Sequence, residues 1–178
     1  FYREEEKSKG RLKPLLAQVL VLSDENNKKS CLIAVDSLGF SKNQTDEIRI
    51  NVAKCIGTKK ECVMVCFSHT HSAPDSSDSR YGYFNFACNR IYDIVKEAAS
   101  KLKAIFIGWD NVQAEIGVNR RNTDAEIDKR VGVLKICDAD SMEIKLLVLR
   151  MTAHGNTLKR DNYFISPDWF GDVRDLVG

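Results

Sequence analysis

The apolar residues of the chain fall into short runs that are separated by polar, turn-rich links. The first two runs, residues 15–23 and 30–36, flank the polar sequence DENNKK. Runs of this length around such a turn predict two antiparallel strands. A third run, residues 61–68, has the apolar character of a buried strand and leads directly into HTHSAP. The first part of the chain is therefore expected to contribute three strands to one sheet.

A helix is predicted between the second and third of these strands. Ser41 suits the N-cap position, and Gln44 completes a capping-box pattern. Gly57 is suited to end the helix. The apolar residues between these points recur at approximately helical spacing, at Ile48, Ile50, Val52, Ala53 and Ile56. Because a strand–helix–strand unit normally joins parallel strands, part of the sheet should be parallel.

The rest of the chain continues this alternation of helix and strand. A long helix is predicted over residues 83–103, followed by one or two strands within 104–119. Residues 130–137 and 143–151 predict two strands joined by the turn sequence DADS, and the second strand leads into TAHGNTL. The polar residues 1–14 are expected to form a surface arm.

Together these elements predict an α/β fold with a mixed β-sheet and flanking helices. The sequence contains no internal repeat and no linker, so residues 1–178 are expected to form a single domain. The chain begins at Phe1 rather than at methionine, and its last residues, DVRDLVG, predict a helix that is cut short. We therefore expect an incomplete part of a longer protein.

The composition excludes some classes of partner. Hydrophobic residues make up 43% and charged residues 29%, which is ordinary for a globular protein. The 27 basic and 25 acidic residues alternate and leave a net charge of +2, so no broad field for nucleic acid is expected. No apolar run approaches the roughly 20 residues of a transmembrane helix. The oligomeric state stays open.

The six cysteines lie mostly within apolar runs, and none forms a CxxC pair. Cys62 and Cys66 have a spacing known from zinc fingers, but the alternating pattern between them predicts a strand. We expect buried free thiols. Free thiols favour a reducing compartment, and so the cytoplasm.

The chain has only three histidines, and two of them form a His–Thr–His triplet. Residues i and i+2 of an extended segment point to the same side, so His69 and His71 should reach one site. His154 follows another predicted strand. Imidazole is a preferred zinc ligand, and catalytic zinc usually has three protein ligands and a water. The spacing predicts a metal or catalytic site, with ordinary surface or core histidines as the alternative.

Three other classes of hydrolase fit the sequence less well. A metallo-β-lactamase site requires HxHxDH, but Ala73 and Pro74 occupy the last two positions here. A TIM-barrel amidohydrolase carries HxH on an early barrel strand, whereas an antiparallel pair precedes the triplet in this chain. The serine-hydrolase motif GxSxG is absent from the sequence.

The segment FSHTHSAP is similar to the THTHSGP signature of neutral, non-lysosomal ceramidases and their bacterial relatives. The segments GVNRRN, RVGVLKICDADSMEIKLLVLRMTAHG and ISPDWFGDV resemble later segments of the same family in the same order. The resemblance covers most of residues 10–175. It departs from the family pattern at Ala73, which replaces a glycine, and the chain's 8% aromatic content gives no sign of a long acyl-chain groove.

The resemblance implies the N-terminal portion of the catalytic domain of a larger zinc hydrolase. His69 and His154 match zinc ligands of the family. His71 matches a histidine beside the metal, and Arg120 matches an arginine that contacts the substrate. The remaining zinc ligands of the family, a glutamate and a tyrosine, would lie beyond Gly178, so activity of these 178 residues alone stays open.

The implied reaction is hydrolysis of an amide (N-acyl) bond, as in the conversion of ceramide to sphingosine and fatty acid in sphingolipid metabolism. The substrate would be a lipid or small N-acyl molecule. Two alternatives are kept: an amidase or esterase of the same fold that acts on a smaller, non-lipid substrate, and a non-catalytic domain that binds a ligand.

Several polar residues near the histidines have both a site interpretation and a structural one. Asp36 and Asp168 would either support the site or serve as a turn residue and a helix cap. Arg121 is interpreted as a surface charge. The hydroxyl groups in and beside the triplet would form hydrogen bonds either around the histidines or to the backbone. They belong to Ser68, Thr70 and Ser72.

Overall fold

The computed structural model describes residues 7–77 and 82–178, which divide into two compact units. The first unit comprises the residues up to Leu102 together with Gly155–Gly178, and the second comprises Lys103–His154. The first unit contains β1 (Gly10–Arg11), β2 (Ala17–Ser23), β3 (Lys29–Val35), α1 (Lys42–Ile56), the short 3₁₀ helix η1 (Lys60–Cys62), β4 (Val63–Phe67), α2 (Tyr83–Ser100), β8 (Phe164–Ile165) and α3 (Trp169–Val177). The second contains β5 (Ile105–Gln113), β6 (Arg130–Asp138) and β7 (Ile144–Arg150). The expectation of one domain stays a prediction.

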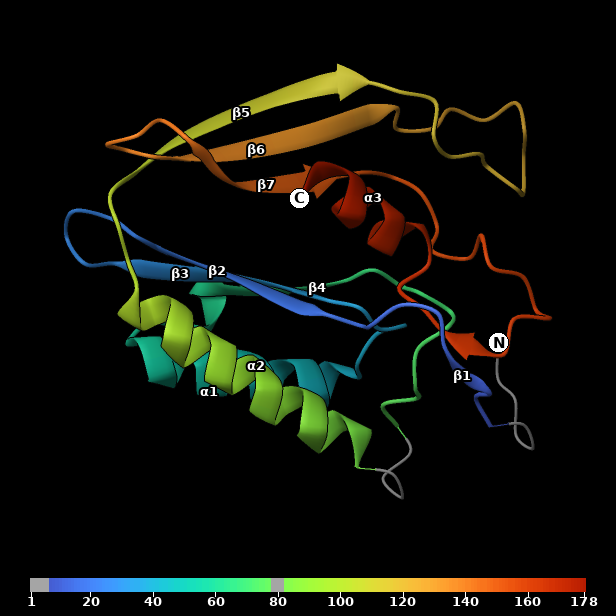
Figure 1. Cartoon of the computed structure of the whole chain (residues 1–178), viewed down its shortest axis with the longest axis horizontal. Coiled ribbons are helices and arrows are strands. Elements are labelled where there is room, and N and C mark those ends of the chain that lie inside the picture. The colour runs from blue at the N-terminus through green and yellow to red at the C-terminus, as the bar shows by residue number, and fades with distance from the viewer. Residues whose placement is uncertain (1–6, 78–81) are drawn as a thin grey trace. The chain divides into compact units, whose positions relative to one another are not determined.

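The main sheet of the first unit has the order β2–β3–β4 and is mixed, as the sequence predicts. Strands β2 and β3 are antiparallel, with Val21 opposite Cys31, whereas β3 and β4 are parallel, with Ile33 opposite Val65. Helices α1 and α2 lie on one face of this sheet (Figure 1). Between the helices and the sheet lies an apolar core of buried residues that includes Ile33, Ile48, Val52, Ile91 and Val95. An α/β fold with a mixed sheet and flanking helices is thus confirmed.

The ends of α1 follow from local side-chain chemistry. The Ser41 hydroxyl accepts from the Gln44 backbone N–H, and the Gln44 side chain accepts from the Ser41 N–H, which completes the predicted capping box. Gly57 ends the helix in the left-handed conformation, with φ of 72°, that a residue without Cβ adopts at little cost. Ile50, predicted on the apolar face, is instead 39% exposed.

Strand β4 is buried on one side rather than throughout. Val63 is buried, but Met64 is 61% exposed and Cys66 is exposed as well. The prediction of a fully buried strand was wrong because among the described residues the helices α1 and α2 pack on one face of the sheet, so alternate side chains of β4 remain outside. Three of the six free cysteines are exposed, namely Cys66 on β4, Cys55 on α1 and Cys62 on η1, which corrects the expectation of buried thiols.

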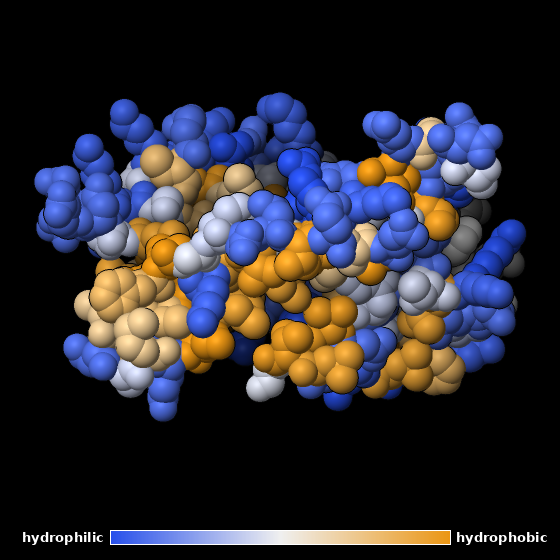
Figure 2. Space-filling model, turned by 90° about the horizontal axis from the view of Figure 1, so that it is seen from above, coloured by the Kyte–Doolittle hydropathy of each residue, from blue (hydrophilic) through white to orange (hydrophobic). Residues whose placement is uncertain are grey.

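The second unit is a three-stranded antiparallel sheet of order β5–β6–β7. The predicted strands of the second half therefore form their own sheet instead of joining the first. Trp109 lies over Gly132, where an added Cβ would come within 2.5 Å of the indole ring. The edge strand β5 exposes several large apolar side chains, at Phe106, Ile107, Trp109 and Val112. Apolar surface is visible among charged groups in the view of Figure 2.

The predicted N-terminal arm is partly tied to the body of the first unit. Strand β1 pairs in parallel with β8, with Gly10 opposite Phe164, and the N–H of Leu12 donates to the carbonyl of Ile165. Residues 7–12 are exposed, as predicted for a surface arm, but β1 is paired with β8 and is not free. The first six residues of the arm lie outside the described part of the chain. None of the described helices is long and apolar enough to cross a membrane.

Candidate metal centre

The parallel pairing of β3 and β4 places the loops that follow them at one edge of the sheet. Val35 and Phe67 lie opposite each other, and the Ser68 N–H donates to the Val35 carbonyl at 3.1 Å. The next residue, His69, has a φ of 56°, a left-handed conformation that is uncommon outside glycine. Its Nδ1 lies 2.6 Å from the carbonyl oxygen of Leu38 in the loop after β3. Because β3 and β4 are neighbours, the loop after β3 places the Leu38 carbonyl beside His69 and orients its ring.

The three histidines come together in the structure. One ring nitrogen of each of His69, His71 and His154 lies within 4.8 Å of the others. The rings of His69 and His71 have centroids 5.2 Å apart and are nearly perpendicular. His69 and His154 are exposed and His71 is half-buried. Their roles as ligands stay predictions, but the convergence that those roles require is present.

Gly155 explains how His154 comes near the triplet. The boundary between the two units falls between these two residues, so His154 is joined by one peptide bond to a residue of the first unit. The Gly155 carbonyl accepts from the His71 N–H at 3.2 Å. A Cβ at this buried glycine would lie 2.9 Å from the Ser68 carbonyl oxygen and 3.2 Å from that of His69. Only a residue without a side chain allows this approach of the two loops.

The donor set fits a zinc ion. The Leu38 carbonyl can only accept, so Nδ1 of His69 carries the proton and Nε2 carries the lone pair that binds a metal. A carbonyl partner of this kind is the usual support for a ligating histidine. Ligands of a tetrahedral zinc site lie about 3.3 Å apart for bonds of about 2.0 Å. In the structure one ring nitrogen of each histidine lies within 4.8 Å of the others, which is the separation from which a metal would draw them together.

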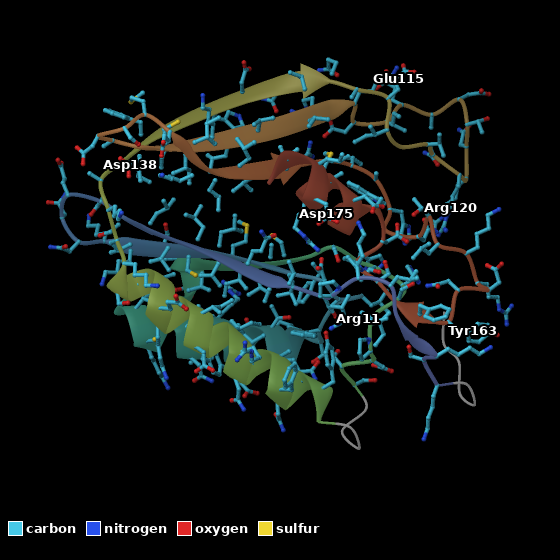
Figure 3. All side chains as sticks on the ribbon, viewed as in Figure 1. Arg11, Glu115, Arg120, Asp138, Tyr163 and Asp175 are labelled. Carbon is cyan, nitrogen blue, oxygen red and sulfur yellow. The ribbon has the colours of Figure 1, made fainter. Side chains whose placement is uncertain are left out.

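Arg120 lies in the exposed loop 114–129 of the second unit, between β5 and β6 (Figure 3). The Asn119 side chain shapes this loop by accepting from the N–H groups of Arg121 and Asn122. Arg121 is exposed, as predicted for a surface charge. The contact of Arg120 with a substrate stays a prediction.

Asp36 and Asp168, for which the sequence allowed either a site role or a structural role, both form hydrogen bonds that support the fold. Asp36 is 2% exposed, and its carboxylate binds the Arg174 guanidinium with distances of 3.0 and 2.6 Å. The same carboxylate accepts from the Leu16 N–H. Asp168 is the N-cap of α3, which was one of the two roles expected for it. Its carboxylate accepts from the Trp169 N–H at 2.8 Å.

The Asp168 carboxylate also accepts from Thr157 and Leu158, in the loop that follows His154. Burial acts to raise the pKa of the Asp168 carboxyl, but the hydrogen bonds from Thr157, Leu158 and Trp169 outweigh it, so this pKa lies below its ordinary value. Asp168 therefore stays ionised at neutral pH although it is buried.

The hydroxyl groups in and beside the triplet have different hydrogen-bond partners. Thr70 is fully buried and donates to the Ser166 carbonyl, whereas Ser72 Oγ accepts from the Asn162 side chain. Within the described residues, Ser68 Oγ is a buried polar atom without a hydrogen-bond partner. Sequence reasoning missed Asn162 and Ser166, for which no motif exists. Gly155 could have been found, because a glycine directly after a candidate ligand is a local signal.

No protein-family model and no curated protein matches this chain. A solved structure titled "Ceramidase complexed with C2" matches it with a TM-score of 0.75 over 95% of the chain, at 21% sequence identity. The chain spans 31% of the length of that ceramidase. An α/β fold covering part of a larger molecule is what the resemblance in the motifs led us to expect. The chain thus has a ceramidase-like fold.

Proposed function

We propose that this chain is part of a zinc-dependent hydrolase that cleaves an amide (N-acyl) bond. The observation that carries the proposal is the convergence of His69, His71 and His154. The ceramidase-like fold supports the proposal, because the similar structure bears the name of an amide hydrolase. The substrate that this likeness favours is ceramide, which would be cleaved to sphingosine and fatty acid.

His69 and His154 would hold the metal. Zinc supplies Lewis-acid chemistry when bound, since it makes water more acidic and polarises a carbonyl group. His69 is prepared for this role because the Leu38 carbonyl fixes its tautomer and ring orientation. The backbone of His71 is held by Gly155, which keeps its imidazole beside the other two rings.

His71 would act in proton transfer. An imidazole titrates near neutral pH and can both accept a proton from water and donate one to a leaving amine. Arg120 would bind the substrate or stabilise negative charge on the carbonyl oxygen, because a guanidinium stays charged and carries several donors. The remaining ligands would come from the part of a full-length hydrolase that these 178 residues do not span.

The test is metal analysis of the longest gene product that carries this chain, together with assays of N-acyl substrates of different chain length. His69→Ala and His154→Ala should lose both zinc and turnover. His71→Gln should keep zinc and lose turnover by about 100-fold or more, the size of a general acid–base contribution. A wild-type protein with no stoichiometric zinc would refute the proposal and favour a binding domain. Turnover limited to short acyl groups would favour the amidase alternative.

A further inference from the structure

We infer that Thr70 and Asp168 are positioning residues, which act through one buried hydrogen-bond network to hold the histidine-bearing loops in register. The inference rests on the proposed function, since it assigns these residues to the same site. Every bond in the network lies within the first unit. Thr70, Ser166 and Asp168, its central members, are all at least 96% buried.

Thr70 ties the triplet to the segment before α3. Its side chain lies between the two histidines in sequence, and Oγ1 donates to the Ser166 carbonyl at 2.8 Å. The same oxygen accepts from the Ser72 N–H at 3.2 Å. The Ser166 N–H returns a bond to the Ser72 carbonyl at 3.0 Å. The backbone on both sides of His71 is thereby fixed to one point, Ser166.

Asp168 ties the loop after His154 to the same segment. Its Oδ1 accepts from the Thr157 N–H at 3.1 Å and from the Thr157 hydroxyl at 2.6 Å. Its Oδ2 accepts from the Leu158 N–H at 3.0 Å. The Asp168 N–H donates to the Ser166 hydroxyl at 3.0 Å. Ser166 therefore connects the two histidine-bearing loops through its carbonyl on one side and its hydroxyl on the other.

Helix capping alone does not account for Asp168. An N-cap side chain normally accepts from backbone N–H groups at the start of its own helix. Here only the Trp169 N–H belongs to α3, and three of the four donors to this carboxylate lie in the loop after His154. The backbone of Asp168, with φ of 59° and ψ of −153°, occupies a region that is nearly exclusive to glycine. Glycine would adopt this backbone conformation at lower cost, so the presence of aspartate at position 168 indicates that its carboxylate is needed there.

The network and the direct contact between the loops form a closed path. From His71 the path runs through Thr70, Ser166 and Asp168 to Thr157, and the chain then leads back through Gly155 to the His71 N–H. A loop held at two separate points has less rotational freedom than a loop held at one point. This arrangement keeps the imidazoles of the triplet and of His154 near one another before any metal binds.

The test uses the three histidines as reporters by long-range ¹H–¹⁵N NMR at neutral pH, which distinguishes the imidazole tautomers. Thr70→Val removes the hydroxyl at nearly constant volume, and Thr70→Ser restores it. The matched control is Thr58→Val, because the Thr58 hydroxyl also donates to a backbone carbonyl, that of Lys29, at 2.6 Å elsewhere in the same unit. Asp168→Asn probes the other half of the network.

The wild type, Thr58→Val and Thr70→Ser should show His69 as one tautomer, with the proton on Nδ1. Thr70→Val and Asp168→Asn should show mixed tautomers and a 10-fold or larger loss of Co²⁺ affinity. A Thr70→Val spectrum identical to that of Thr58→Val would overturn the inference. Failure of the proposed function is separate, since it appears as absence of zinc from the wild-type gene product while the tautomer result stands.

Discussion

At the scale of single residues, Gly155 limits how closely the two histidine-bearing loops approach. The Gly155→Ala variant would place a methyl 2.9 Å from the Ser68 carbonyl oxygen and 2.9 Å from the Phe170 ring. We expect it to destabilise the protein by about 1–3 kcal/mol, the usual cost of overpacking. Urea unfolding followed by tryptophan fluorescence measures the change.

The matched control for this substitution is Gly108→Ala. Gly108 lies in β5, and an added Cβ there meets no atom within 4 Å. Its effect on the free energy of unfolding should stay within about 0.5 kcal/mol. Equal effects of the two substitutions would show that the loops do not need the glycine at position 155.

Asp168 predicts a specific dependence of stability on pH. Its pKa is lowered in the folded protein, so its contribution is fully present above the ordinary carboxyl value of about 3.9 and is lost as the pH falls through the folded value. Asp168→Asn should therefore cost about 1.5–3 kcal/mol at pH 7. The gap between wild type and variant should shrink below about pH 4. Urea unfolding at pH 7, 5 and 3 checks this, and a gap that is constant with pH would contradict it.

At the scale of secondary-structure elements, the ion pair between Asp36 and Arg174 links α3 to the end of β3. Arg174→Met would leave a carboxylate that is 2% exposed without its cation. Removal of one partner from such a buried pair is expected to cost about 3 kcal/mol. Lys145→Met, which breaks an exposed pair with Glu143, should cost less than about 1 kcal/mol. Similar unfolding midpoints for the two variants would count against the link.

The elements that could be predicted from the sequence are those specified by residues close together in the chain. The capping box of Ser41 and Gln44 and the turn between β6 and β7 are examples, because each needs only a few adjacent residues. The approach of His154 to the triplet was predictable only through the resemblance in the motifs.

The rest of the fold depends on contacts between distant segments or on backbone groups. The β1–β8 pair consists of two-residue strands, which are too short to show a period-two pattern. The partner of His69 is the carbonyl of Leu38, and every residue type has a carbonyl. Sequence patterns carry no signal for such partners, so the supporting contacts of the candidate site could not be predicted even where its histidines could.

At the scale of the whole molecule, a bound metal should stabilise the fold by mass action. Zinc at 100 times its dissociation constant should raise the free energy of unfolding by about 2.7 kcal/mol. Thermal unfolding of the chain with zinc, and again after a chelator is added, measures this effect. His69→Ala should abolish the shift, whereas an equal shift in this variant would place the binding elsewhere.

The pairing of β1 with β8 has a consequence for the order of events during synthesis. Ser8 donates to the carbonyl of Tyr163, 155 positions later in the sequence. A nascent chain can assemble β2, β3, β4 and the two helices on them while translation continues, because their contacts are nearer in sequence. Strand β1 must wait, unpaired, until β8 has left the ribosome, and closure of so large a loop is slow. Docking of this first strand should therefore be a late step in folding.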